Sequence, residues 1–209
     1  MVGSRVLAEA TGRGHHVLAL SRTPAPTDAA EVTPVEADLG TPHTLGKVLA
    51  AATAERPLDA LVLAVRTFPA DEAFLTDATR AVLDAAAALG TRVLVVGGAG
   101  ALLSPSAPGL RVADDPAYVP PGWRAVAAAG IAQLETCRAH AHQDWTYLSP
   151  PANLAPGDRT GRYRCGTDTL LTEADGSSWI SAEDLATAVV DELENPGAGR
   201  MFTVAHQSA

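Results

Sequence analysis

The sequence predicts an α/β fold of the Rossmann-like type, in which a doubly wound parallel sheet is covered by helices on both faces. Segments with strand-like hydrophobicity alternate along the chain with segments of helical periodicity, which is typical of parallel α/β sheets. The chain has 209 residues, enough for one domain of this kind, and it contains no internal repeat or interdomain linker. We therefore expect one NAD(P)-binding domain over residues 1–209.

The elements before residue 40 begin with a helix. Ser4–Thr11 has helical character and ends at Gly12, a usual residue just past a helix C-terminus. Apolar side chains at His16–Leu20 predict a buried strand, and those at Val32–Ala37 predict a shorter one. A doubly wound domain opens with a strand and a glycine-rich turn before its first helix, whereas this chain has only Gly3 there. We expect the sheet to lack that first strand.

The middle of the chain carries the clearest periodicity. Leu45–Ala54 is expected to be helical, and the apolar run Leu58–Val65 predicts the next strand. A longer helix is predicted over Asp71–Leu89, because apolar side chains recur every three or four residues until Gly90 ends the pattern. Arg92–Val96 then predicts a strand that runs into Gly97 and Gly98.

The last part of the chain has weaker signals. Ser104–Gly122 is rich in proline and glycine and predicts a long loop, which in a compact domain is usually functional or mobile. A helix over Arg124–Ala141 and a strand over Trp145–Leu148 follow, and a turn-rich segment then extends to Ser178. Ser181, with an acidic residue three positions later, is expected to cap a helix that ends at Glu194. Met201–Val204 predicts a last short strand.

Composition excludes several classes of protein. The chain has 24 acidic and 15 basic residues and a net charge of −9, which argues against nucleic-acid binding. No apolar run reaches the roughly 18 residues of a membrane span, and no signal peptide is recognisable, so we expect a cytoplasmic protein. Cys137 and Cys165 are expected to be reduced, and the spacing of Cys137, His140 and His142 does not fit a metal site on a helix.

Several residues fall at the carboxyl ends of the predicted strands or at the start of the first helix, where open α/β sheets bind ligands. Arg22 follows one strand, where a cation can pair with the 2′-phosphate of NADP(H), and Asp38 follows the next, where it could bind adenine. The alternative is that Arg22 and Arg66 are solvated surface residues and that the glycines form turns. The residues assigned to an NADP(H) site are Gly3, Ser4, Ser21, Arg22, Asp38, Ala64, Val65, Arg66, Gly97, Gly98 and Pro150.

Over nearly its whole length the chain resembles the NADH-flavin reductase-like, NAD(P)H-binding group of the atypical short-chain dehydrogenase/reductases, which is NmrA-like and more distantly similar to biliverdin reductase B. Four runs carry the resemblance: VVGGAGAL at 95–102, SPP at 149–151, PGDRTGRYR at 156–164 and ISAEDLA at 180–186. Members of this group begin with an apolar strand and a Gly-x-x-Gly-x-x-Gly motif, of which Met1–Ser4 supplies only the last glycine. An internally assigned start and a real truncation would both explain this.

The resemblance favours an NADP(H)-dependent oxidoreductase that acts on a small molecule. The acid/base motif Tyr-x-x-x-Lys is absent, because Lys47 is the only lysine and follows no tyrosine at that spacing. Reduction of a flavin or another planar acceptor needs no such pair, since the protein mainly orients the reactants. Tyr118, with Trp123 in the long loop, is assigned to the acceptor, although both residues could simply anchor that loop.

Two other functions remain open from the sequence. A chain without most of its phosphate-binding loop could be a cofactor-independent cyclase, dehydratase or isomerase, or a nucleotide-sensing regulator without catalysis. The basic residues Arg159, Arg162 and Arg164 could hold an anionic substrate, but a solvated hairpin is the simpler interpretation. A homodimer is also left open.

Overall fold

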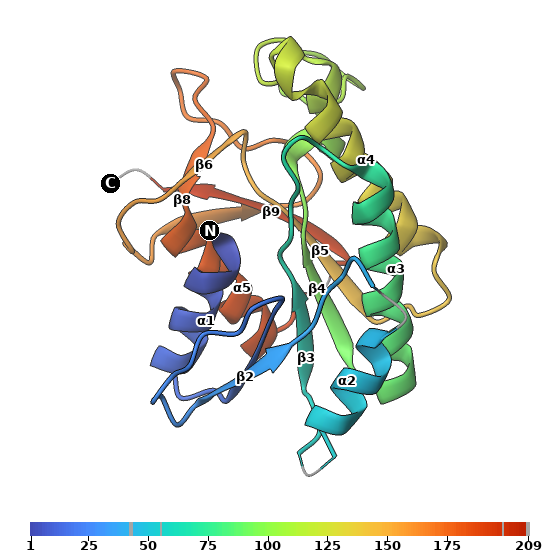
Figure 1. Cartoon of the computed structure of the whole chain (residues 1–209). Helices are drawn as coiled ribbons and strands as arrows, with labels where there is room; N and C mark the ends of the chain where they lie inside the picture. Colours follow the sequence, from blue (N-terminus) through green and yellow to red (C-terminus); the bar gives the residue numbers. More distant parts are fainter. Residues whose placement is uncertain (42–43, 55, 198, 208–209) are drawn as a thin grey trace.

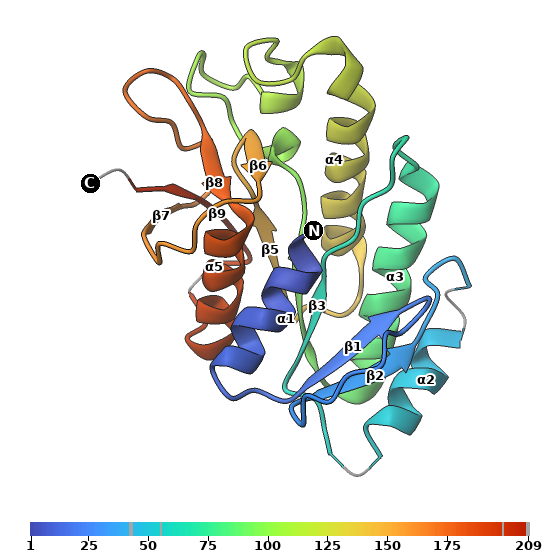
Figure 2. The same cartoon turned by 60° about the vertical axis from the view of Figure 1, so that its left-hand side comes forward.

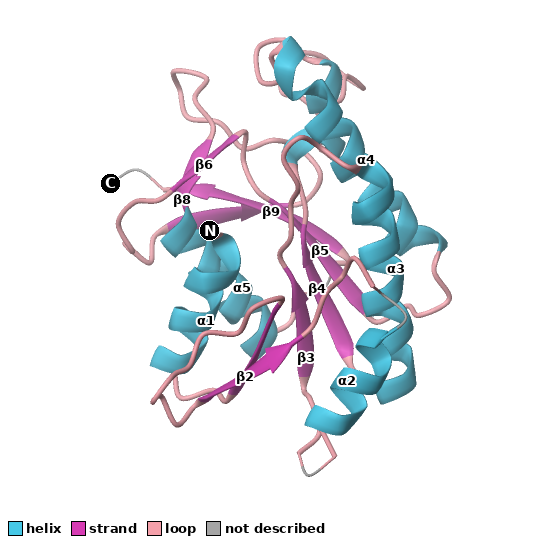
Figure 3. Ribbon diagram, in the orientation of Figure 1, coloured by secondary structure: helices cyan, strands magenta, loops and turns pink. Residues whose placement is uncertain are grey.

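The computed structural model describes residues 1–41, 44–54, 56–197 and 199–207 and has the predicted α/β architecture (Figure 1). One face of the sheet is covered by α1 (Val2–Gly12) and α5 (Ala182–Glu194), which pack against each other. The other face is covered by α2 (Leu45–Ala52), α3 (Glu72–Leu89) and α4 (Arg124–Ala139). Figure 3 shows the central strands of the sheet between these two helical layers.

The main sheet has five strands in the order β3-β4-β5-β9-β7. Four are mutually parallel: β3 (Ala60–Leu63), β4 (Arg92–Val96), β5 (Trp145–Ser149) and β9 (Met201–His206). The edge strand β7 (Tyr163–Gly166) runs antiparallel to β9. Val93, Leu94 and Val95 are fully buried, as expected for a central strand covered on both faces.

The doubly wound sheet, which was expected to lack its first strand, is divided into two parts. Strands β1 (Val17–Ser21) and β2 (Val32–Glu36) form a separate two-stranded parallel sheet. Among the described strands, β1 pairs only with β2 and β3 pairs only with β4, so the two parts do not join. Figure 2 shows β1 and β2 side by side and set apart from β3.

Helices α3 and α5 begin at capping residues, and the roles of Gly90 and Ser181 at helix ends were predicted. Asp71 caps α3, because its carboxylate accepts a hydrogen bond from the Phe74 N–H at 2.9 Å, and Gly90 ends the helix in the left-handed conformation. Ser181 caps α5 by accepting the Asp184 N–H at 2.9 Å. These caps fix where α3 and α5 begin.

The segment between β5 and α5 contains more strand than predicted. It forms β6 (Asn153–Ala155), β8 (Trp179–Ser181) and β7, and β6 pairs with β8 in a small parallel sheet. The long loop at 104–122 is irregular, as predicted, apart from short 3₁₀ turns at Val112–Asp114 and Pro121–Trp123. None of the helices in the described ranges has the length and apolar character needed to cross a bilayer.

Candidate nucleotide site

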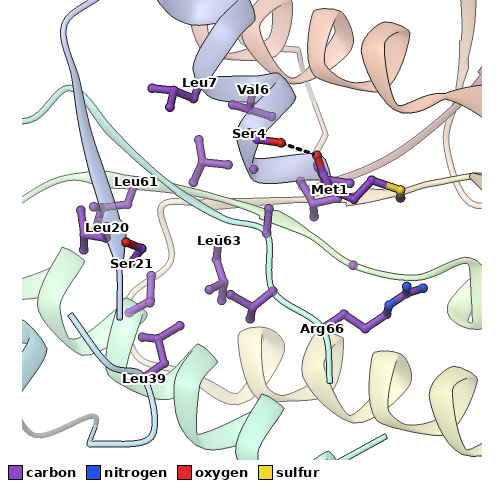
Figure 4. Close-up of a pocket in the computed structure, with 18 of the residues that line it drawn as sticks. Met1, Ser4, Val6, Leu7, Leu20, Ser21, Leu39, Leu61, Leu63 and Arg66 are labelled. Carbon is purple, nitrogen blue, oxygen red and sulfur yellow. Dashed lines mark hydrogen bonds between the residues drawn. The ribbon is translucent and has the colours of Figure 1, made fainter. Parts of the chain in front are cut away.

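A cavity of about 2470 Å³ lies between the two parts of the sheet and extends to the carboxyl ends of the strands. Figure 4 shows Leu20, Ser21, Leu63 and Arg66 around this cavity, close to the beginning of α1. All the residues that the sequence assigns to the site line this one cavity: Gly3, Ser4, Ser21, Arg22, Asp38, Ala64, Val65, Arg66, Gly97, Gly98, Tyr118 and Pro150.

The first turn of α1 forms one end of the cavity. Met1 is the N-cap, and no side chain caps the turn. Ser4 Oγ donates a hydrogen bond to the Met1 carbonyl at 3.0 Å, so that hydroxyl does not occupy the first amides of the helix. A helix N-terminus carries a partial positive charge and unpaired N–H groups, which favour an anion. This turn can therefore contribute to binding a phosphate.

Arg22 and Asp38 line the cavity just after the two strands of the small sheet. Arg22 is exposed, and none of the ion pairs found among the described residues involves it. Asp38 is held in a turn, because its Oδ1 accepts a hydrogen bond from the Gly40 N–H at 2.8 Å. The guanidinium can bind an anionic group, whereas one carboxylate oxygen of Asp38 already stabilises its own loop.

Gly97 and Gly98 follow β4 and differ in their surroundings. A Cβ atom at Gly97 would lie 1.9 Å from Cζ of Tyr147, so the need for glycine at position 97 comes from this buried ring. A Cβ atom at Gly98 would have no heavy atom within 4 Å. Both glycines line the cavity, as the sequence assigns them, but only Gly98 leaves open space where its side chain would be.

The fully buried ring of Tyr147 supports the site from below, and no pattern in the sequence indicates this role. Its hydroxyl donates a hydrogen bond to the Gly130 carbonyl at 2.9 Å and accepts the Gly98 N–H at 3.4 Å. Burial raises the pKa of this phenol well above its usual range. Tyr147 is therefore a neutral support beneath Gly98.

Trp123 and Tyr118 line the cavity, and Phe68 lies beside Trp123. Trp123 is 47% exposed, and the Arg66 guanidinium carbon lies 6.0 Å from the centre of its ring. Phe68 is 78% exposed, and its ring centre is 6.2 Å from that of Trp123. Tyr118 lines the same cavity and is half-buried against the small core of the long loop. Sequence reasoning missed Phe68, because an aromatic residue in a loop has no periodic neighbours.

Two other groups of charged residues lie outside the cavity. Arg159 binds Glu9 at 2.6 Å and Arg164 binds Glu173 at 2.8 Å, so these two side chains form ion pairs within the protein. Asp115, in the long loop, accepts hydrogen bonds from Ser104 Oγ at 2.5 Å and from the Ala117 N–H at 2.9 Å, and these bonds lower its pKa. The carboxylate thus fixes the loop that carries Tyr118.

Comparisons with known proteins place the chain in a family. The sequence profile of the family described as NAD(P)H-binding matches residues 1–196. The uncharacterised protein YwnB of Bacillus subtilis (strain 168) is 36% identical over 198 residues, which cover 93% of this chain and 88% of YwnB.

Solved structures are also similar to this chain over nearly its whole length. A "putative exported protein" from Burkholderia pseudomallei is 38% identical, with a TM-score of 0.83 over 99% of this chain and 95% of that one. A "putative epimerase" from Bacteroides thetaiotaomicron is 32% identical, with a TM-score of 0.84 over 100% and 93% of the two chains. A "putative NADH-flavin reductase" from Streptococcus pneumoniae TIGR4 is 26% identical, with a TM-score of 0.81 over 99% and 94%.

The family match and the cavity at the carboxyl ends of the strands agree with each other. Open α/β sheets bind nucleotides at this edge, beside the N-terminus of the first helix. The names of the relatives differ in the reaction that they state, so they do not assign one to this chain. On its sequence and its fold, this chain is a member of the NAD(P)H-binding family.

Proposed function

We propose that the chain is an NADP(H)-dependent oxidoreductase that reduces a planar acceptor such as a flavin. The observation that carries the proposal is the single cavity in which the α1 N-terminus, Arg22 and the open Gly98 come together. These groups fit a nucleotide, because two of them can bind phosphates and the third leaves space for a flat ring beside the backbone. A nicotinamide cofactor bound there would supply a hydride to the acceptor.

The residues of the chain have distinct roles in this proposal. The first turn of α1 binds the pyrophosphate, and Arg22 binds the 2′-phosphate that distinguishes NADP(H) from NAD(H). Gly98 lets the nicotinamide approach the backbone, and Ala64, Val65 and Pro150 confine it from the neighbouring strand ends. Tyr118 and Trp123 stack on the acceptor and exclude water, with Arg66 beside them.

No tyrosine–lysine pair takes part. The residues that line the cavity in the described part of the chain include no lysine. A planar acceptor that takes the hydride directly on its ring does not need this pair, so the cavity suits a flavin or quinone-like ring better than a carbonyl substrate. The similarity to a protein named a "putative NADH-flavin reductase" also supports a flavin as the acceptor. A cytoplasmic location stays a prediction.

The test is a calorimetric titration of the folded chain with NADPH and with NADH. We expect NADPH to bind at micromolar concentration, and Arg22→Ala to weaken NADPH by roughly tenfold or more while changing NADH little, since an arginine–phosphate pair is a strong charge-assisted interaction. Arg138→Ala is the matched control, because Arg138 is exposed on α4 and does not line the cavity.

Two results would contradict the proposal. Equal losses for the two nucleotides in Arg22→Ala would remove the assignment of NADP(H). No binding at millimolar NADPH by a folded protein would remove the oxidoreductase itself. With binding established, oxidation of NADPH in the presence of free flavin measures the proposed reaction directly.

A further inference from the structure

One end of the cavity is lined by Arg66, Tyr118 and Trp123, and we call it the acceptor end. Arg66 is exposed just after β3, and none of the ion pairs found in the described ranges involves it. In Figure 4 Arg66 lies well apart from Ser21, the residue before Arg22. Arg66 is therefore separate from the strand end that carries Arg22.

Few charged side chains line the acceptor end. Among the described residues that line the cavity after the carboxyl ends of β3, β4 and β5, only Arg66 and Asp71 are charged. The Asp71 carboxylate caps α3, so its charge lies against the partial positive charge of that helix N-terminus. The guanidinium of Arg66 therefore decides how this end of the cavity meets a charged ligand.

Hydrogen bonds within the loop between β3 and α3 hold it in place. Thr67 Oγ1 accepts the Asp71 N–H at 2.7 Å, and Asp71 Oδ1 accepts the Phe74 N–H at 2.9 Å. Arg66 begins this loop, so its side chain extends from a backbone that is already ordered. An anion that binds there does not have to order the loop first, which lowers the entropic cost of binding.

The side chains beside Arg66 are aromatic and exposed. Its guanidinium carbon lies 6.0 Å from the ring centre of Trp123, and the ring centre of Phe68 lies 6.2 Å from that of Trp123. Exposed aromatic rings can stack on a flat ligand, while a guanidinium can bind a phosphate or a carboxylate through two parallel hydrogen bonds. The arrangement therefore suits a ligand that combines a flat ring with an anionic group.

We propose that Arg66 selects acceptors that carry an anionic group, a phosphate or a carboxylate, beside the planar ring. This inference rests on the proposed function, which puts a planar acceptor against Tyr118 and Trp123. It assigns Arg66 to the acceptor, whereas the sequence assigns it to the nucleotide. The net charge of the whole chain predicts the opposite preference, because a protein of charge −9 repels an anion unless a local cation binds it. Tighter binding of an anionic acceptor would therefore reveal such a cation.

The test compares two pairs of flavins that share the same ring system. FMN differs from riboflavin by a phosphate, and 10-carboxymethylflavin differs from lumiflavin by a carboxylate. Each is titrated into the folded chain without nucleotide, and binding is followed by flavin fluorescence. We expect the anionic member of at least one pair to bind roughly five- to tenfold more tightly at low ionic strength, and added salt to reduce this advantage. The pair that shows the preference identifies the anionic group.

Variants of Arg66 test which cation is responsible. Arg66→Gln removes the charge and should abolish the preference for the anionic flavin, whereas Arg66→Lys retains the charge and should keep part of it. Arg66→Gln should also weaken the anionic flavin more than NADPH. Arg124→Ala is the matched control and should keep the preference, because Arg124 is exposed next to Trp123 but does not line the cavity.

Three outcomes would overturn the assignment of Arg66: no preference for either anionic flavin, the same preference in Arg66→Gln, or an equal loss of NADPH and anionic flavin in that variant. The last result would return Arg66 to the nucleotide site. If none of the four flavins binds, the flavin acceptor of the proposed function fails and this inference fails with it. The NADPH titration reports separately on the nucleotide site, so these failures are distinguishable.

Discussion

At position 97 a methyl group would lie 1.9 Å from the ring of Tyr147, which is fully buried and held by its hydrogen bond to Gly130. Gly97→Ala is therefore expected to overpack the core and lower the free energy of unfolding by about 1–3 kcal/mol. For a chain of this size that corresponds to a fall in Tm of roughly 2–4 °C per kcal/mol, measured by calorimetry.

The neighbouring glycine provides the matched control. A methyl group at Gly98 would meet no heavy atom within 4 Å, so Gly98→Ala should leave Tm unchanged. If the nicotinamide ring approaches the backbone there, the same substitution should weaken NADPH binding. Unchanged affinity in Gly98→Ala would place the ring elsewhere in the cavity, and an unchanged Tm in Gly97→Ala would show that the Tyr147 ring can move.

Single residues also show what sequence could predict about the site. Arg22 and Gly98 were predictable, because a position just after a strand already defines the edge of the sheet at which it lies. The role of Tyr147 was not predictable, since it depends on β4 and β5 lying side by side in one register. Phe68 was missed for a similar reason, because its proximity to Trp123 joins two loops that are far apart in the sequence.

Among the elements, α1 is joined to the rest of the fold through Glu9. Its carboxylate accepts hydrogen bonds from Arg159 at 2.6 and 2.8 Å and from Arg13 at 2.8 Å, and its side chain is 8% exposed. The hydrogen bonds from Arg159, partly opposed by burial and reinforced by Arg13, lower the pKa of Glu9 from 4.5 to about 2. A carboxyl with a depressed pKa stabilises the folded state above its unfolded value and loses that contribution as the pH falls.

We therefore expect Glu9→Gln to lower the free energy of unfolding at pH 7 by roughly 1–3 kcal/mol. The difference from the unsubstituted chain should shrink as the pH falls from about 4.5 to 2, in denaturant titrations at several pH values. Glu135→Gln is the control, since Glu135 pairs with Arg138 on an exposed face of α4. A constant difference at all pH values would mean that the charge of Glu9 is not what joins α1 to its neighbours.

The elements differ in how far sequence defines them. The strand at 92–96 was predicted with its observed bounds, because its apolar run matches its burial on both faces. Strand β7 was not predicted, since Tyr163–Gly166 has neither an apolar run nor a clear alternation. It exists through its antiparallel pairing with β9, a contact between distant parts of the chain that local periodicity does not contain.

For the molecule as a whole, the division of the sheet should produce unequal local stability. The main sheet has a buried centre, whereas β1 has an open inner edge and Leu20 is 38% exposed. Native-state hydrogen exchange reports such local opening residue by residue. We expect the Leu18 and Leu20 amides to exchange much faster than the Leu94 amide, which bonds toward β3 within the buried sheet.

The Ala19 amide, directed to β2, is the internal comparison, because it shares their strand but not their open edge. Equal protection of Leu20 and Leu94 would show that β1 and β3 are joined in solution, and the separation of the two sheets would then be wrong.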